Sequence, residues 1–236
     1  MQTFGLISCL AKMEEKFGNI SLINGDCLEV LRGLKDKSFS LAIVDPPYGI
    51  GASDYQRGGT QYGKSLARCK SYDKKQWDNY PPPLAYFIEL QRVSKNQIIW
   101  GANHFISRMP YDSSCWVVWD KDNGNNGYAD CELAWTSFDC AVRRFKFKWQ
   151  GMLQENMKEK EVRIHPTQKP VALYKWLLDR FAKPGDTILD THLGSGSICI
   201  AAHDLGFTML GIELDEKYYQ AAKQRLLYHQ AQLQLF

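Results

Sequence analysis

Short apolar runs alternate along the chain with longer segments whose apolar residues recur at helical spacing. The runs rich in β-branched and aromatic residues predict buried strands, and the longer periodic segments predict helices. Strands are predicted over 19–23, 39–44, 97–100, 115–119, 132–138, 141–149, 187–190 and 208–214. Helices are predicted over 27–34, 81–93, 169–182 and 197–206, and from about 216 onward.

This alternation predicts the architecture. Strands joined by helices favour a mostly parallel sheet with helices on both faces, in the α/β class. At 236 residues the chain fits a single domain over 1–236. Met13 is a candidate alternative start, which would leave 1–12 as a loose extension. Segments 51–75 and 120–130 carry no clear pattern, and the first exceeds normal loop length, which makes it a candidate for function.

Composition excludes some classes of protein. Hydrophobic residues make up 44% and charged residues 23%, which is typical of globular proteins. The net charge is only +3, so any attraction to nucleic acid must come from local clusters. Seven cysteines form no CxxC pair and the histidines lack ligand spacing, so no metal site is expected. The first apolar stretch is too short to span a membrane, and we expect a cytoplasmic protein with reduced thiols.

A glycine turn follows one of the predicted strands. Gly194-Ser195-Gly196 leads from Asp190 into a helix, where glycines let a ligand approach the backbone and the helix N-terminus offers N–H groups. Glu213 ends the next strand, where an acid can accept hydrogen bonds from ribose hydroxyls. The spacing differs from GxGxxG, which favours a nucleoside-bearing cofactor over a pyrophosphate. A plain strand-to-helix turn beside an exposed acid is the alternative.

The motif DPPY forms a rigid turn at the end of the predicted strand 39–44. Asp45 and Pro46 each precede a proline and are held extended, and neither Pro46 nor Pro47 has an N–H. The turn therefore presents two acceptors, the Asp45 carboxylate and the Pro46 carbonyl, beside the flat ring of Tyr48. This set suits a planar ring with an amino group that donates two hydrogen bonds. The alternative is that the rigid turn has only a structural role, or that it is a polyproline ligand for a partner domain.

DPPY (45–48), followed by HPTQKP (165–170) and LDTHLGSGS (189–197), resembles the amino-group DNA methyltransferases that use S-adenosylmethionine. The catalytic motif precedes the glycine motif, which is the permuted order of their β class. INGDC (23–27) is similar to the family's segment beside the cofactor adenine, and GIELDEKYY (211–219) to its ribose-binding segment. The resemblance implies a Rossmann-like methyltransferase fold that binds S-adenosyl-L-methionine.

The resemblance also implies roles for individual residues. The target base is flipped out of the duplex and stacks on Tyr48, while Asp45 and the Pro46 carbonyl favour the tetrahedral nitrogen that forms during attack. The expected catalytic residues are Asp45, Pro46, Pro47 and Tyr48. The expected cofactor-binding residues are Asp26, Cys27, His165, Thr167, Lys169, Asp190, His192, Gly194, Ser195, Gly196 and Glu213.

Three of these residues also have other interpretations. Asp26 is a candidate helix cap, and His165 and Thr167 are candidate caps for the helix that starts near Pro170. Lys169 is expected to pair with the carboxylate of the cofactor. The family commonly has Asp-Pro-Phe where this chain has Asp190-Thr191-His192, so the contact that the phenylalanine makes with the methionine part of the cofactor is changed.

The motifs are compatible with more than one class of substrate. DPPY occurs in adenine-N6 and in cytosine-N4 enzymes, and family habit favours adenine. The alternatives to an adenine-N6 DNA methyltransferase are a cytosine-N4 enzyme, an RNA or protein-amide methyltransferase, and a non-catalytic DNA-binding relative.

Two basic segments, 55–75 and 141–163, carry aromatic residues among their cations. We expect phosphate contacts there, with a solvated surface as the alternative. The candidate DNA-binding residues are Arg57, Lys64, Arg68, Arg143, Arg144, Lys146 and Lys148. The candidate DNA-recognition segments are 51–75 and 120–163, which contain these basic stretches. We expect them to hold double-stranded DNA from two sides, and a homodimer is a candidate for completing the clamp.

Overall fold

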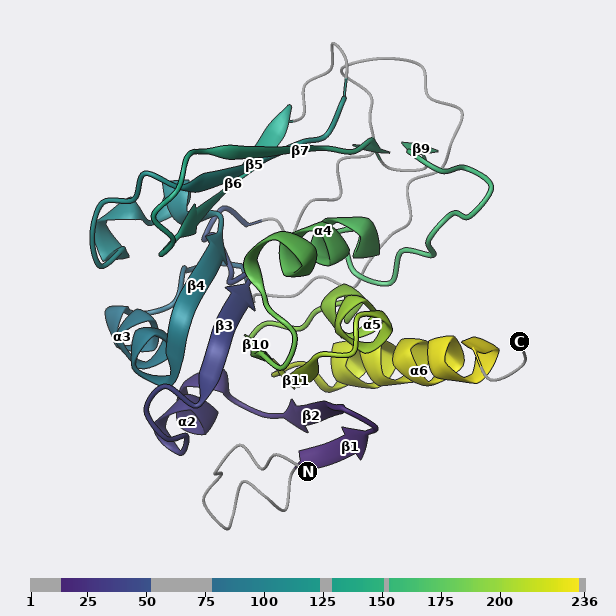
Figure 1. Ribbon diagram of the computed structural model, residues 1–236, viewed down its shortest axis with the longest axis horizontal. Helices are drawn as coiled ribbons and strands as arrows, with labels where there is room; N and C mark the ends of the chain where they lie inside the picture. Colours follow the sequence, from purple (N-terminus) through teal and green to yellow (C-terminus); the bar gives the residue numbers. More distant parts are fainter. Residues whose placement is uncertain (1–13, 52–77, 124–128, 151–152, 234–236) are drawn as a thin grey trace.

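The computed structural model describes residues 14–51, 78–123, 129–150 and 153–233. A nine-stranded sheet runs through this part of the chain in the order β1-β2-β11-β10-β3-β4-β6-β5-β7 (Figure 1). A separate two-stranded sheet pairs β8 (Trp149–Gln150) with β9 (Leu153–Gln154). The predicted α/β class, a mixed and mostly parallel sheet with helices, is confirmed.

The centre of the large sheet is parallel. Its strands are β2 (Ile20–Asn24), β11 (Thr208–Glu213), β10 (Thr187–Asp190), β3 (Phe39–Val44) and β4 (Ser94–Trp100). Their near-continuous apolar sequences suit strands that are covered on both faces. Successive side chains alternate between the faces, so Leu41 and Ile43 pack on one side and Ala42 and Val44 on the other.

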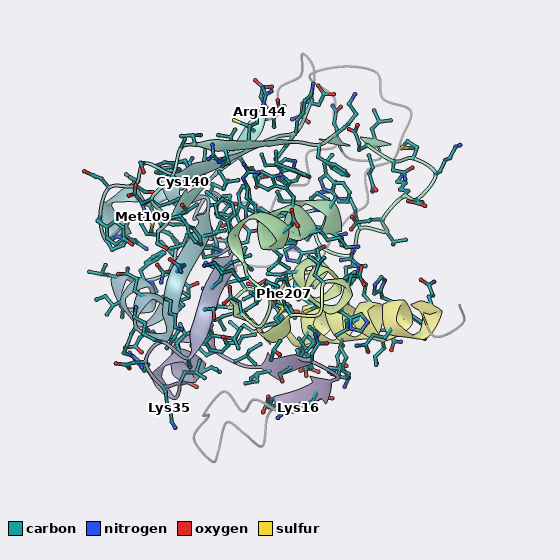
Figure 2. All side chains as sticks on the ribbon, viewed as in Figure 1. Lys16, Lys35, Met109, Cys140, Arg144 and Phe207 are labelled. Atoms are coloured by element: carbon teal, nitrogen blue, oxygen red, sulfur yellow. The ribbon has the colours of Figure 1, made fainter. Side chains whose placement is uncertain are left out.

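Helices cover both faces of this centre. They are α2 (Cys27–Arg32), α3 (Leu84–Val93), α4 (Val171–Phe181), α5 (Ser197–Asp204) and α6 (Glu216–Leu233). α2 and α3 pack on the face that carries Ala42 and Val44, and α4, α5 and α6 pack on the opposite face (Figure 1). Buried side chains fill both layers, and Phe207 joins the second one at the start of β11 (Figure 2).

Three strands extend the sheet beyond β4, namely β6 (Cys131–Thr136), β5 (Trp116–Asp120) and β7 (Arg143–Lys146). β6 is antiparallel to β4 and to β5, and β7 is parallel to β5. The start of β6 and the ends of β5 and β7 therefore lie at the edge where the central strands end. On the far side of the sheet, β1 (Glu14–Phe17) pairs antiparallel with β2.

Most predicted elements are present, and the differences have local causes. The helix predicted from residue 81 begins at Leu84, because Pro81 and Pro82 each precede a proline and are held extended, and the extended Pro83 is its N-cap. The strand predicted over 141–149 ends as β7 at Lys146, and the chain continues into β8. β1, β9 and the 3₁₀ turns η2 (Ala102–His104) and η3 (Ile106–Arg108) have no counterpart among the predictions. The expected extension 1–12 and most of segment 51–75 lie outside the described residues.

β3 and β10 are neighbours whose chains leave in opposite directions along the sheet. β3 is followed by α3 and β4 on one side, and β10 by α5 and β11 on the other. In open α/β sheets, ligands bind in the crevice at the carboxyl ends of strands at such a switch point. None of the helices in the described part of the chain combines the length and apolar character needed to cross a membrane.

Candidate active site

A cavity of about 730 Å³ opens at the carboxyl ends of β2, β3, β10 and β11, a volume suited to a small-molecule site. Many of the predicted site residues line it: Asp26, Cys27, Asp45, Pro47, His165, Thr167, Lys169, His192, Gly194, Ser195 and Glu213. Four others lie outside its lining: Pro46, Tyr48, Asp190 and Gly196. The fold thus brings together segments that are far apart in the sequence.

Asp78 holds the backbone of the DPPY turn. Its Oδ1 accepts hydrogen bonds from the N–H groups of Tyr48 at 2.6 Å and Gly49 at 2.9 Å. The side chain is buried, and the Asp78 carbonyl accepts a third bond from the N–H of Gly51 at 3.0 Å. The sequence prediction missed Asp78 because it lies in a segment without a periodic pattern.

Tyr48 is packed against the turn that follows β4. Its hydroxyl donates to Asp45 Oδ1 at 2.7 Å, and its ring stacks on His104 with centroids 5.1 Å apart and an interplanar angle of 16°. Gly101 has a φ of +70°, and a Cβ there would lie 2.1 Å from Tyr48 Cε1. Glycine is therefore required at 101 for the close approach of the tyrosine ring. The stacking of a target base on Tyr48 stays a prediction.

Lys169 contacts the DPPY turn, which is called the acceptor turn below because it presents the Asp45 carboxylate and the Pro46 carbonyl. Its Nζ is 2.5 Å from Asp45 Oδ2, 3.0 Å from Glu132 Oε2 and 3.2 Å from the hydroxyl of Tyr48. The structure thus places this ammonium on the carboxylate of Asp45, although Lys169 also lines the cavity. Its expected pairing with a cofactor carboxylate stays a prediction. Glu132 also forms an ion pair with Lys121 at the end of β5.

The charges of this cluster perturb one another. Burial and the nearby Glu132 carboxylate raise the pKa of Asp45, and Lys169 only partly offsets them. Burial alone would raise the pKa of Glu132, but the ammonium groups of Lys169 and Lys121 outweigh it and lower that pKa to about 2. Burial opposes the charge on Lys169, yet Asp45 and Glu132 raise its pKa. Glu132 is therefore ionised and Lys169 protonated near neutral pH.

Glu213 ties the glycine turn to the end of β11. Its Oε2 accepts from the N–H of Gly194 at 2.8 Å, and its Oε1 accepts from the N–H of Asp215 at 2.9 Å. Gly196 serves packing, because a Cβ there would lie 3.0 Å from the Cβ of Ala222 in α6. The guanidinium of Arg225 donates to the carbonyl of Ser195 at 2.9 Å.

His192 presents a ring to the cavity. Its ring lies edge-on to Tyr86, with centroids 5.2 Å apart, and its Nδ1 is 2.9 Å from Thr191 Oγ1. Burial lowers the pKa of His192 to about 4, so the imidazole is neutral at neutral pH. Beneath it, Asp190 Oδ1 accepts from the N–H of His192 at 3.0 Å. Burial raises the pKa of Asp190 to about 8, so this carboxyl keeps its proton at neutral pH.

Of the predicted helix caps, Asp26 is confirmed and His165 and Thr167 are not. Asp26 caps α2, since its Oδ1 accepts from the N–H groups of Leu28 at 2.8 Å and Glu29 at 3.1 Å, and it lines the cavity as well. The capping of α4 by His165 and Thr167 is wrong.

The N-cap residue Pro170 provides no side-chain cap, and the N–H of Val171 donates to Glu161 Oε1 at 2.9 Å. His165 and Thr167 bond to each other instead, with 3.1 Å between Nδ1 and Oγ1.

The cations of the second basic segment lie on and after the edge strand β7. Lys146 and Lys148 approach Asp122 at 3.0 and 3.4 Å, and Arg144 lies 3.9 Å from Asp120. Because β7 is parallel to β5, Lys146 and Lys148 lie at the edge of the sheet that carries the cavity, and Arg143 begins the strand away from it. The first segment's candidates, Arg57, Lys64 and Arg68, lie outside the described residues.

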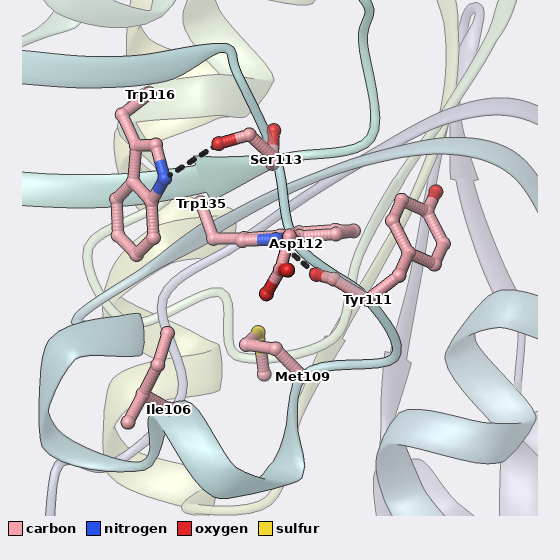
Figure 3. Close-up of a pocket in the computed structure, with 7 residues that line it drawn as sticks. All are labelled: Ile106, Met109, Tyr111, Asp112, Ser113, Trp116 and Trp135. Carbon is pink, nitrogen blue, oxygen red and sulfur yellow. Dashed lines mark hydrogen bonds between the residues drawn. The ribbon is translucent and has the colours of Figure 1, made fainter.

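A second, smaller cavity of about 220 Å³ lies between η3 and the start of β5 (Figure 3). Its lining residues are Ile106, Met109, Tyr111, Asp112, Ser113, Trp116 and Trp135. The two indole N–H groups donate to backbone carbonyls of the same loop, Trp116 to Ser113 and Trp135 to Tyr111. None of the predicted site residues lines this cavity.

The fold is similar to that of solved structures that include a DNA methyltransferase. The solved structure titled M1.HpyAVI–SAM complex matches 88% of this chain and 100% of its own with a TM-score of 0.51 and 22% identity. The PvuII DNA methyltransferase, described as cytosine-N4-specific, matches 88% of this chain and 86% of its own with a TM-score of 0.55 and 15% identity. At these identities the likeness establishes the fold.

Sequence comparison establishes the family. A family model for DNA methylases of the N6/N4 type matches residues 70–224, more than half of the chain. The type II methyltransferase M.HinfI of Haemophilus influenzae is 28% identical over 87% of this chain and 68% of its own length. The chain therefore belongs to the N6/N4 DNA methylase family, whose methyl donor is S-adenosylmethionine.

Proposed function

We propose that this protein is a site-specific DNA methyltransferase that methylates the exocyclic amino group of a flipped-out base, with adenine N6 as the target. One observation carries the proposal. Asp45 lines the same cavity as Gly194 and Glu213. An acceptor for an amino group and a site for a nucleoside therefore share one space, as in-line transfer between them requires.

The cavity residues fit S-adenosylmethionine. Glu213 stands where a ribose is expected, and Asp26 and Cys27 stand where the family's adenine contact is expected. When bound, this cofactor supplies a methyl group on a sulfonium. The neutral ring of His192 does not repel a sulfonium cation, so it can take the place of the phenylalanine that is common in the family.

In this proposal the DPPY turn orients the target amino group. The Asp45 carboxylate and the Pro46 carbonyl accept its two N–H groups, which draws the nitrogen lone pair out of the ring and toward the methyl group. The imidazole of His104 now stacks on the ring of Tyr48. His104 is exposed and free to be displaced from that face, and we assign the same face to the flipped base, which takes the place of the imidazole.

We assign Lys146 and Lys148 to phosphate contacts, because they lie at the edge of the sheet that carries the cavity. Double-stranded DNA is the proposed substrate. A second subunit that completes the clamp is part of the same proposal.

Cytosine N4 is the second candidate target. The observation that favours it is the shared fold with a cytosine-N4-specific enzyme. Asp45 can accept a hydrogen bond from either amino group, so the acceptor turn does not discriminate between adenine and cytosine.

The decisive experiment identifies the methylated base. The protein is incubated with methyl-labelled S-adenosylmethionine and unmethylated genomic DNA, and the digested nucleosides are separated by mass spectrometry. Label in N6-methyladenine supports the proposal, and label in N4-methylcytosine supports the second candidate. Label in added RNA or protein alone, or in nothing, refutes both.

A further inference from the structure

A chain of alternating charges, with a buried Lys169 between half-buried neighbours, leads from the end of β5 to the DPPY turn. Lys121 pairs with Glu132, Glu132 Oε2 lies 3.0 Å from Lys169 Nζ, and Lys169 Nζ lies 2.5 Å from Asp45 Oδ2. The Lys169 side chain is 2% exposed, so it meets these carboxylates almost without water. Charges buried in this way are retained only when each has its partners.

The ammonium of Lys169 lies where the proposed reaction needs another group. It is a tetrahedral nitrogen that donates to Asp45, and the target amino group becomes a tetrahedral nitrogen at the same carboxylate. The hydroxyl of Tyr48 already donates to the other oxygen, Asp45 Oδ1, at 2.7 Å. A target amino group that approaches Asp45 Oδ2 from the side on which Lys169 lies therefore competes with this ammonium.

Glu132 provides a second carboxylate for the same ammonium. If Lys169 had no partner besides Asp45, its displacement would leave a buried cation unpaired, which is strongly unfavourable. A shift toward Glu132 keeps the ammonium paired and leaves the net charge of the cluster unchanged.

We propose that Glu132 is a positioning residue for methyl transfer: it holds Lys169 when the target amino group replaces that ammonium on Asp45. This inference rests on the proposed function of the cavity and of the DPPY turn. It assigns a role to a residue of β6 that no motif marks. Lys121 affects the exchange, because it pairs with Oε1 of Glu132 while Lys169 pairs with Oε2, and the two ammonium groups share the charge of one carboxylate.

The groups that face Asp45 come from each element around it. They are Tyr48 of the same turn, Glu132 of β6, Lys169 before α4, Tyr174 of α4 and Asp190 of β10. Tyr174 is uncharged near neutral pH because burial raises its pKa well above the usual value, and Asp190 keeps its proton. Lys169 and Glu132 are therefore the charged groups among these neighbours.

The first test replaces Glu132 with glutamine, which keeps the shape and removes the charge. We expect the KM for DNA to rise about tenfold or more, because Asp45 is then the one carboxylate that holds Lys169, with the Kd for S-adenosylmethionine unchanged. Glu29→Gln, an exposed acid of α2, is the matched control and should behave as the parent. Glu132→Asp, which keeps the charge, should recover part of the loss.

The second test separates positioning from folding. In a Lys169→Met background the competing ammonium is gone, so Glu132→Gln should cause less than about a twofold further change in kcat/KM. If Glu132→Gln lowers kcat/KM by the same factor in the Lys169→Met background as in the parent, the inference is overturned.

A third readout needs only the single variant. Removal of the Glu132 charge should move the acid limb of the kcat/KM profile to lower pH, because that charge raises the pKa of Asp45. An unmoved limb together with a lowered Tm would show a merely structural role. A parent that methylates no DNA refutes the proposed function and this inference with it. An active parent matched by Glu132→Gln refutes the inference alone.

Discussion

The N–H of Gly194 donates a hydrogen bond to Glu213 Oε2 at 2.8 Å, which joins the turn after β10 directly to the acid at the end of β11. The acid therefore shapes the glycine turn as well as lining the cavity. Two oxygens of one carboxylate hold two backbone N–H groups, those of Gly194 and Asp215. Any substitution of Glu213 affects the turn and the proposed ribose contact together.

We expect Glu213→Ala to weaken the binding of S-adenosylmethionine by about 1–3 kcal/mol, since the half-buried N–H groups of Gly194 and Asp215 lose their acceptor and the ribose its partner. Calorimetric titration measures the change. The 2′-deoxy analogue of the cofactor separates the two effects. If Glu213 contacts the ribose, the analogue should bind the parent less well and should bind Glu213→Gln with little further loss. A parent that binds both ligands equally would limit Glu213 to shaping the turn.

Asp45→Ala should abolish methyl transfer and leave cofactor affinity within about twofold of the parent, because the acceptor carboxylate acts on the target nitrogen. Lys169 keeps a carboxylate partner in Glu132 at 3.0 Å, so the variant should remain folded. Calorimetry with S-adenosylmethionine gives the cofactor affinity, and a labelled-methyl assay gives the rate of methyl transfer. An equal loss in both would mean that Asp45 belongs to the cofactor site.

Gly101→Ala should reduce kcat strongly while cofactor binding is retained. The added Cβ would lie 2.1 Å from Tyr48 Cε1, so the ring and its hydrogen bond to Asp45 must move. Gly206→Ala is the matched control, because Gly206 has a similar φ of +75° and nothing within 4 Å of its Cβ position. The backbone strain of about 1 kcal/mol is then common to both variants. If both lose the same activity, the contact with Tyr48 does not matter for catalysis.

His192 makes folding stability depend on pH. Burial lowers its pKa to about 4 in the folded protein, and an unfolded histidine titrates near 6.5. Between these values the unfolded chain binds more protons, so stability is lost as the pH falls through this window.

His192→Phe removes this dependence. The loss of unfolding free energy from pH 7 to pH 5 should shrink by about 1–2 kcal/mol relative to the parent. Urea unfolding at the two pH values measures it. The raised pKa of Asp190 has the opposite effect on stability, but both proteins share it. An unchanged slope would show that His192 is protonated in the folded state.

The sequence predicts the central strands well and the charge cluster poorly. β3 and β10 coincide with the predicted 39–44 and 187–190, because uninterrupted apolar runs end at turn residues there. The contact of Lys169 with Glu132 depends on the direction of β6, whose first residues meet the ends of parallel strands only because β6 is antiparallel. Alternating patterns do not encode strand direction. The close approach of Gly101 to Tyr48 likewise depends on tertiary packing.

The last prediction concerns Lys146 and Lys148, which lie on and after β7, at the edge of the sheet where the central strands end. Lys146 and Lys148 keep side-chain exposures of 56% and 41% despite their pairing with Asp122, so they are accessible to a phosphate backbone. Phosphate contacts release counterions, and each contact contributes about 0.9 to the slope of log affinity against log salt. Replacing both lysines with glutamine should therefore weaken duplex binding and flatten the slope by about 1.8 if each makes one contact.

The matched control is Lys35→Gln with Lys183→Gln, which removes the same charge from exposed residues just before β3 and β10, at the opposite edge of the sheet. Fluorescence anisotropy of a labelled duplex across a salt series gives both slopes, and calorimetry checks that cofactor affinity is intact. A control that loses as much slope as the Lys146 and Lys148 variant would mean that net charge alone attracts the DNA. If the variant binds like the parent at every salt concentration, this edge is a solvated surface and the clamp must be formed elsewhere.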